Sequence, residues 1–157
     1  MIKSIVSAVL LSAALAACGG SDTVAVSNKY AATLNGANET PAVTTNGSGT
    51  ATLTVNGGTV TYTVNITGLS AAPLASHLHL GAAGVAGGVV VPFKGLPTTA
   101  TGTFTGTFTE ADIKPSTSPA VTTLADLIVQ MRAGKVYVNV HTSNNQGGEI
   151  RGQVAVQ

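Results

Sequence analysis

The sequence is poor in cysteine and in charge, and each shortage excludes a class of protein. One cysteine in 157 residues cannot form an internal disulfide framework or a cysteine-rich zinc module. A formal net charge of +1, from 7 basic and 6 acidic side chains, gives no electrostatic footprint for nucleic acid. Charged residues make up only 8% of the chain, which argues against an acidic or basic disordered chain. The length suits one domain.

Residues 1–17 have the pattern of a signal peptide. Lys3 supplies a positive charge near the start, and an apolar run of 13 residues from Ile5 to Ala17 follows it. A permanent membrane-spanning helix needs about 20 such residues. A buried core helix is the alternative, and the N-terminal position and the small residues at its end argue against it.

The end of this segment, Leu15 to Gly19, resembles the bacterial lipobox, in which small residues precede a cysteine. The resemblance implies that Cys18 is lipidated and becomes the new N-terminus, so that the acyl chains hold the protein on a membrane. Ordinary secretion with a free cysteine is the alternative. Gly19 after the cysteine favours the outer membrane if the cell is Gram-negative. We therefore expect a lipid-anchored protein of the bacterial cell envelope, on its periplasmic or its outer surface.

Residues 18–28 are small and polar and are predicted to be a flexible tether. The folded domain is expected to comprise residues 29–157. Removal of residues 1–17 also removes Lys3, which leaves 6 basic and 6 acidic side chains and a net charge of zero.

Alternation of apolar and polar residues predicts β-strands through most of this domain. Threonines alternate with apolar residues over 50–55 and 60–66, and the intervening Asn56-Gly57-Gly58 predicts a hairpin. Threonine favours extended backbone and exposes its hydroxyl to water, which explains a soluble surface with few charges. Other strands are predicted over residues 31–34, 77–80, 89–93, 103–109, 136–141 and 149–156.

Short, half-buried strands of this kind indicate an all-β protein, an antiparallel sandwich or barrel. One short helix is predicted from Thr122 or Thr123 to Ala133, followed by Gly134 as a stop. Its apolar residues fall at helical spacing: Leu124, Leu127, Ile128 and Met131.

The three histidines are the candidate metal ligands. His77 and His79 lie two apart in a predicted strand and share one face, with Leu78 and Leu80 on the core face. His141 ends another strand, on the side opposite its valines. Together they would form a three-nitrogen site suited to copper or zinc. The alternative is a hydrogen-bonded network that holds strands and a loop together.

Glu149 and Arg151 are predicted to share the outward face of the last strand and to form a structural ion pair that orders the Gly147-Gly148 turn. The loop between the last two strands would place His141 near Glu149. Glu39 either joins this polar network or is solvated. The glycines between residues 81 and 88 do not form a phosphate loop, since no GK[ST] and no helix follow. No catalytic motif is visible, and we name no catalytic residue.

Three blocks of residues resemble the CHRD (chordin) domain family over about residues 30–156. The first holds Leu34, Gly36, Glu39 and Pro41, and the second is His77-Leu78-His79-Leu80-Gly81. The third, the most specific, joins VYVNVHT at 136–142 to GGEIRGQ at 147–153. Thr40 and Ala42 stand where the family commonly has Val and Pro. The resemblance implies an immunoglobulin-like or Greek-key domain without an established activity.

The leading functional hypothesis is therefore a membrane-anchored, extracytoplasmic binding or structural module of the CHRD type. It holds copper or zinc through the histidines, or no cofactor at all, and it meets a protein partner in the envelope. The His-x-His strand and the distant third histidine also resemble copper/zinc superoxide dismutase in part, although a fourth copper histidine, a zinc-ligand set and a second cysteine are missing. A metal oxidoreductase and a purely structural or adhesive surface module are the alternatives.

Overall fold

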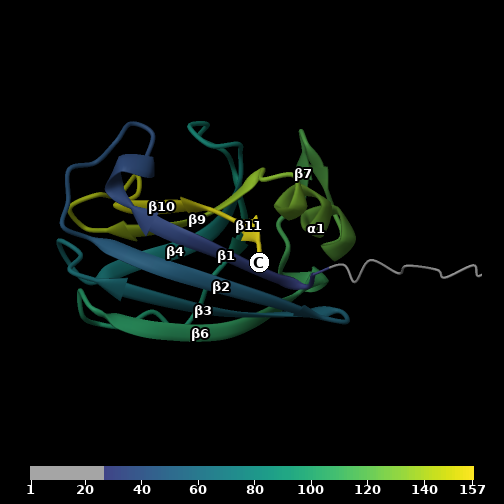
Figure 1. Ribbon diagram of the computed structural model, residues 1–157, viewed down its shortest axis with the longest axis horizontal. Helices are drawn as coiled ribbons and strands as arrows, with labels where there is room; N and C mark the ends of the chain where they lie inside the picture. Colours follow the sequence, from purple (N-terminus) through teal and green to yellow (C-terminus); the bar gives the residue numbers. More distant parts are fainter. Residues whose placement is uncertain (1–26) are drawn as a thin grey trace, which may run out of the picture.

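Every paired strand in the structure runs antiparallel to its neighbour. The computed structural model describes residues 27–157, and its main sheet has the order β5-β4-β9-β10-β1-β2-β3-β6, with β11 paired to β1. The sheet curls into a nearly closed barrel with one short helix, which confirms the predicted fold class (Figure 1). The strands are β1 (Lys29–Asn35), β2 (Ser48–Asn56), β3 (Thr59–Thr67), β4 (Pro73–Leu80), β5 (Val89–Pro92), β6 (Gly102–Thr109), β7 (Ser116–Thr117), β8 (Ala120–Val121), β9 (Val136–Thr142), β10 (Ile150–Gln153) and β11 (Ala155–Val156).

The strands β1, β2, β3 and β6 form the threonine-rich side of the barrel. Their apolar residues point inward, where Leu53, Val64 and Phe104 are almost completely buried, while most of the threonines between them face water. The predicted hairpin joins β2 to β3 with Asn56 opposite Thr59. Gly57 has a φ of 57°, a conformation that glycine adopts without steric cost.

The strands β4, β9 and β10 form the opposite side and carry the candidate site. Leu78 pairs with Val138 across β4 and β9, and both are fully buried in the core, as predicted. The other face of these strands carries polar and aromatic residues, and two loops lie against it. One loop contains the short 3-10 helix η1 (Gly36–Asn38), and the other joins β4 to β5 (Figure 1).

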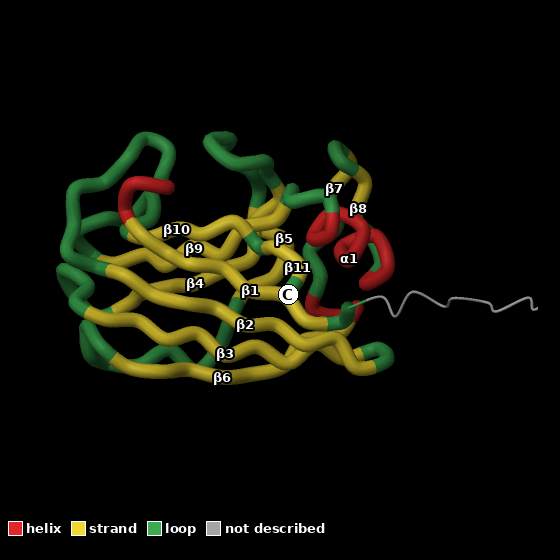
Figure 2. The backbone as a smooth tube through the Cα atoms, in the orientation of Figure 1, coloured by secondary structure: helices red, strands yellow, loops and turns green. Residues whose placement is uncertain are grey.

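The helix α1 (Leu124–Arg132) lies at the end of the barrel at which the described chain begins (Figure 2). Thr123 caps it, because its side chain accepts a hydrogen bond from the backbone N–H of Asp126, and the Asp126 carboxylate accepts one from the N–H of Thr123. Leu127 and Met131 are fully buried against the core. The predicted helix is confirmed to within two residues at each end. No helix among residues 27–157 is long and apolar enough to cross a membrane.

Several elements differ from the sequence prediction. The predicted last strand is divided into β10 and β11, because Val154 turns into the core and its N–H bonds to the carbonyl of Val136. The 3-10 helix η2 (Glu110–Asp112), η1 and the β7–β8 hairpin were not predicted, since each is too short to give a periodic pattern.

The predicted signal peptide 1–17, the lipidation site Cys18 and the tether up to residue 26 lie outside the described residues. The first strand of the domain, β1, begins at Lys29.

Candidate metal centre

The three histidines converge on the outer face of β4 and β9. His77 and His79 alternate with Leu78 on β4, and His141 lies near the end of the neighbouring strand β9, where it pairs with Ala75. The ring centroids of His77 and His141 are 5.0 Å apart, those of His77 and His79 are 5.4 Å apart, and those of His79 and His141 are 6.0 Å apart. The register of the two strands therefore produces the cluster that the spacing suggested.

One ring nitrogen from each histidine lies within 4.8 Å of the other two. Two nitrogens bound to one zinc or copper ion lie at most about 4 Å apart, because each metal–nitrogen bond is about 2 Å long. The closest pair, Nδ1 of His77 and Nε2 of His141, is already 3.2 Å apart. Ring movements of about 1 Å would bring all three nitrogens onto one ion.

Backbone carbonyls fix the orientation of two of the rings. His79 donates from Nδ1 to the carbonyl of Gly87 at 2.9 Å, and His141 donates from Nδ1 to the carbonyl of Gln146 at 2.9 Å. In a neutral imidazole this leaves Nε2 with a free lone pair. The Nε2 atom of His79 is buried and has no hydrogen-bond partner. Carbonyls that hold the second nitrogen are the usual outer shell of metal-binding histidines.

The surroundings keep His77 and His79 neutral. Burial, and to a smaller degree the neighbouring His141 and His79, lower the pKa of His77 to about 4. Burial also lowers the pKa of His79, although its bond to Gly87 opposes this. A metal ligand must be unprotonated, so both imidazoles are ready to bind at neutral pH.

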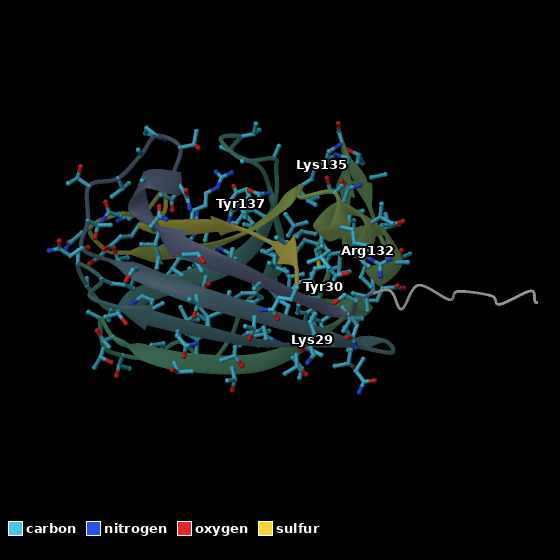
Figure 3. All side chains as sticks on the ribbon, in the orientation of Figure 1. Lys29, Tyr30, Arg132, Lys135 and Tyr137 are labelled. Atoms are coloured by element: carbon cyan, nitrogen blue, oxygen red, sulfur yellow. The ribbon has the colours of Figure 1, made fainter. Side chains whose placement is uncertain are left out.

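A stack of three side chains lies beside the histidines. The ring of His79 packs on the ring of Tyr137 at 4.8 Å with an interplanar angle of 9°, and the guanidinium carbon of Arg151 lies 3.4 Å from the Tyr137 centroid. Figure 3 marks Tyr137 on β9. Its hydroxyl accepts from the N–H of Gly87, the residue whose carbonyl holds His79. Tyr137 was not predicted as a site residue, although its alternation with Asn139 and His141 placed it on this face.

Glu149 does not pair with Arg151, so the predicted ion pair is wrong. The carboxylate accepts from the hydroxyls of Thr45, Ser70 and Thr142 and from the N–H of Ser70, at 2.6–2.7 Å. Burial raises the pKa of Glu149, but these hydrogen bonds outweigh it and hold the pKa at about 2. The predicted hairpin does bring Glu149 close to His141 in the chain, because the N–H of Glu149 bonds to the carbonyl of Val140, but the Glu149 carboxylate is fully buried and is not part of the histidine cluster. It ties the chain near Thr45 and Ser70 to the last hairpin.

Arg151 is buried as well, with 2% of its surface exposed, although the sequence pattern predicted an outward position. Its Nη2 donates to the carbonyls of Ala82 and Val85 at 3.2 and 2.6 Å and so fastens the β4–β5 loop over the sheet. Glu39, for which two interpretations were open, is not solvated: it lies under the η1 loop with 8% of its surface exposed. The outer face of β9 and β10 is therefore a buried polar layer beneath two loops.

The fold and the site together define a class of protein: an antiparallel β-domain with a histidine cluster and a buried polar layer on one side of its barrel. The family model of the CHRD domain matches residues 30–154, and the chain belongs to the CHRD domain family. A search of curated proteins and a search of solved structures each returned no match.

Proposed function

We propose that this protein is a membrane-anchored, extracytoplasmic CHRD module that binds one copper or zinc ion through His77, His79 and His141. The observation that carries the proposal is the Nε2 atom of His79, which is buried and has no partner. A buried polar atom without a partner is costly. A metal ion would satisfy it and would replace the hydrogen bond between Nδ1 of His77 and Nε2 of His141.

The ligand set favours this class of ion. Three imidazoles with no carboxylate and no sulfur suit zinc and copper better than calcium or magnesium, which prefer oxygen. His77 and His141 are only partly buried, so a fourth position remains accessible to water or to a small ligand. This accessible position also fits a protein partner in the envelope that supplies the fourth ligand.

Metal content after equilibrium dialysis tests the proposal. The full chain carries Cys18→Ser in every sample, so that the thiol does not take up metal. We expect one zinc or one Cu(II) ion per chain, and less than a tenth of that after His77→Ala or His141→Ala. Ser143→Ala is the matched control, because Ser143 is exposed in the turn that follows β9, two residues from His141, and it should keep full occupancy.

The same experiment separates the alternatives. If the wild type takes up no metal and the histidine variants lose their near-UV circular dichroism, the histidines serve the fold only. Superoxide turnover by the metal-loaded chain, abolished by His141→Ala, would instead establish a metal oxidoreductase.

We propose the membrane anchor on separate grounds, namely the lipobox-like residues 15–19. Expression in a bacterium followed by fractionation tests it. The chain should sediment with membranes and incorporate labelled palmitate, and Cys18→Ser should abolish the label. A chain that is never labelled would be a secreted or soluble protein instead.

A further inference from the structure

A second candidate site is a cavity on the other side of Tyr137 from the histidines. It has a volume of about 250 Å³. It lies between the η1 loop, the β4–β5 loop and β10. The residues that line it are Ala37, Asn38, Glu39, Ala83, Gly84, Arg151 and Gln153.

Arg151 contributes a buried positive charge that stacks on Tyr137 and touches no carboxylate of the described chain. Among residues 27–157 the one ion pair joins Lys94 to Asp112, so no carboxylate lies within 4.0 Å of the Arg151 guanidinium. Its bonds to the carbonyls of Ala82 and Val85 use Nη2 only. Arginine is almost never buried unless it is paired, because removing a charge from water is costly. The remaining N–H donors of Arg151 can bind an anion in the cavity.

Glu39 contributes a buried carboxyl group that is also incompletely bonded. Its Oε1 atom has no hydrogen-bond partner. Burial raises the pKa of Glu39 to about 7, and the charge of Arg151 opposes this rise. A neutral Glu39 can donate a hydrogen bond, whereas an ionised Glu39 repels a second negative charge.

The walls of the cavity are already held in place. The side-chain amide of Asn38 donates to the carbonyl of Arg151 at 3.1 Å, which fastens the η1 loop to β10. Arg151 fastens the opposite loop, and Gln153 donates to the carbonyls of Gly81, Gly134 and Val136 at 2.6–2.9 Å. A ligand would therefore meet a formed site rather than order a loose one.

We propose that this cavity binds a short-chain carboxylate, with the anion on Arg151 and the hydrocarbon part against Ala37 and Ala83. The planar guanidinium matches a carboxylate with two parallel hydrogen bonds. A singly charged anion suits a cavity that contains Glu39, whereas a doubly charged phosphate would be repelled. The two alanines offer small apolar side chains to the hydrocarbon part of the ligand.

Nuclear magnetic resonance of the ¹⁵N-labelled full chain tests this, with sodium butyrate as the probe and sodium phosphate at equal ionic strength as the comparison. Butyrate should shift the signals of residues 37–39, 83–84 and the Arg151 Nε–H saturably, and phosphate should bind at least tenfold more weakly. Shifts that do not saturate, or equal binding of phosphate, would overturn the proposal.

Three variants make the test specific. Ala83→Leu fills the cavity from an exposed position and should weaken butyrate binding at least tenfold, whereas Ala86→Leu, exposed on the same loop outside the lining, should not change it. At pH 8, Glu39→Gln removes a negative charge and should tighten binding at least threefold. Unchanged affinity in both Ala83→Leu and Glu39→Gln would place the butyrate elsewhere and refute the assignment.

Discussion

The Nδ1 atom of His77 lies 3.2 Å from the Nε2 atom of His141 and donates to it, because Nδ1 of the neutral His141 ring carries that ring's hydrogen. The other nitrogen of His141 is held by the carbonyl of Gln146, and the Nε2 of His79 faces the pair without a partner. The Nε2 atoms of His79 and His141 thus have lone pairs, whereas Nδ1 of His77 carries a hydrogen. Metal binding at Nδ1 of His77 would move this hydrogen to Nε2 of the same ring, so only the additional proton of an imidazolium would compete with the metal, which leads to the first prediction.

Metal should be retained at an acidity at which ordinary histidines release it. Because the pKa of His77 is lowered to about 4 and that of His79 is also lowered, protons compete weakly at pH 6. We expect zinc content after dialysis to be equal at pH 7.5 and pH 6 and to be lost near pH 4. Half-release near pH 6.5, the value of an unperturbed histidine, would show that the rings are not held as described.

The metal-free protein should also lose stability as the pH falls from 6.5 toward 4. A group with a lower pKa in the folded than in the unfolded state binds its proton first in the unfolded state. The contribution of His77 is therefore present above pH 6.5 and is lost as the pH falls toward 4. Urea denaturation from pH 7 to pH 4 should show a smaller loss of stability in His77→Gln than in the wild type. Equal losses would contradict the assignment.

Gly87 should not tolerate a side chain, because a Cβ atom there would collide with the backbone carbonyl of Leu80. Gly87→Ala must displace the loop that holds both His79 and Tyr137. We expect a loss of at least about 2 kcal/mol in the free energy of unfolding and a 10- to 100-fold weaker affinity for zinc. Gly88→Ala is the control, since a Cβ atom at that position meets nothing within 4 Å, and it should change neither quantity.

Glu149→Gln should destabilise the protein by about 1–3 kcal/mol in urea denaturation at pH 7, because an amide NH₂ would face hydroxyl groups that now donate to a carboxylate. The folded-state pKa of about 2 lies below the ordinary 4.5, so this stabilisation is present above pH 4.5 and disappears as the pH falls toward 2. Gln157→Glu, the reverse exchange at an exposed side chain, is the control and should change the stability by less than about 0.5 kcal/mol. A Glu149 variant as stable as this control would refute the role given to the carboxylate.

The contribution of Glu39 to stability should depend on pH in the opposite direction to that of Glu149. Its folded-state pKa of about 7 exceeds the ordinary 4.5, so its contribution is present below pH 4.5 and is lost as the pH rises through 7. The difference in stability between Glu39→Gln and the wild type should therefore change with pH over that interval, by at most about 1.4 kcal/mol per pH unit. A pH-independent difference would show that Glu39 titrates normally.

The fold was accessible from the sequence because each strand carries its own pattern. Threonine alternation located β2, β3 and β6, and Asn56-Gly57 located the turn between β2 and β3. The family resemblance rested on the same residues that form the site, and His77, His79 and His141 were brought together as expected. A two-residue period places alternate side chains on one face of a strand, and the antiparallel register of β4 and β9 then brings the histidines of the two strands together.

The alternation could not reveal that the second face of β9 and β10 is covered. It placed Tyr137, Asn139 and Arg151 opposite the valines, and all three are there, but they are buried rather than exposed. Burial depends on two loops that fold back over the sheet, and a loop leaves no periodic signal. The error about the Glu149–Arg151 pair has the same origin, since Thr45 and Ser70 lie 104 and 79 residues from Glu149 in the chain.

Zinc K-edge X-ray absorption of the full chain in the Cys18→Ser background tests the central claim most directly, because it reports the ligands rather than the affinity. The proposed site predicts a first shell with three imidazole nitrogens at about 2.0–2.1 Å, reduced to two in His79→Ala. A first shell made of oxygen alone, or an imidazole number that His79→Ala leaves unchanged, would contradict it.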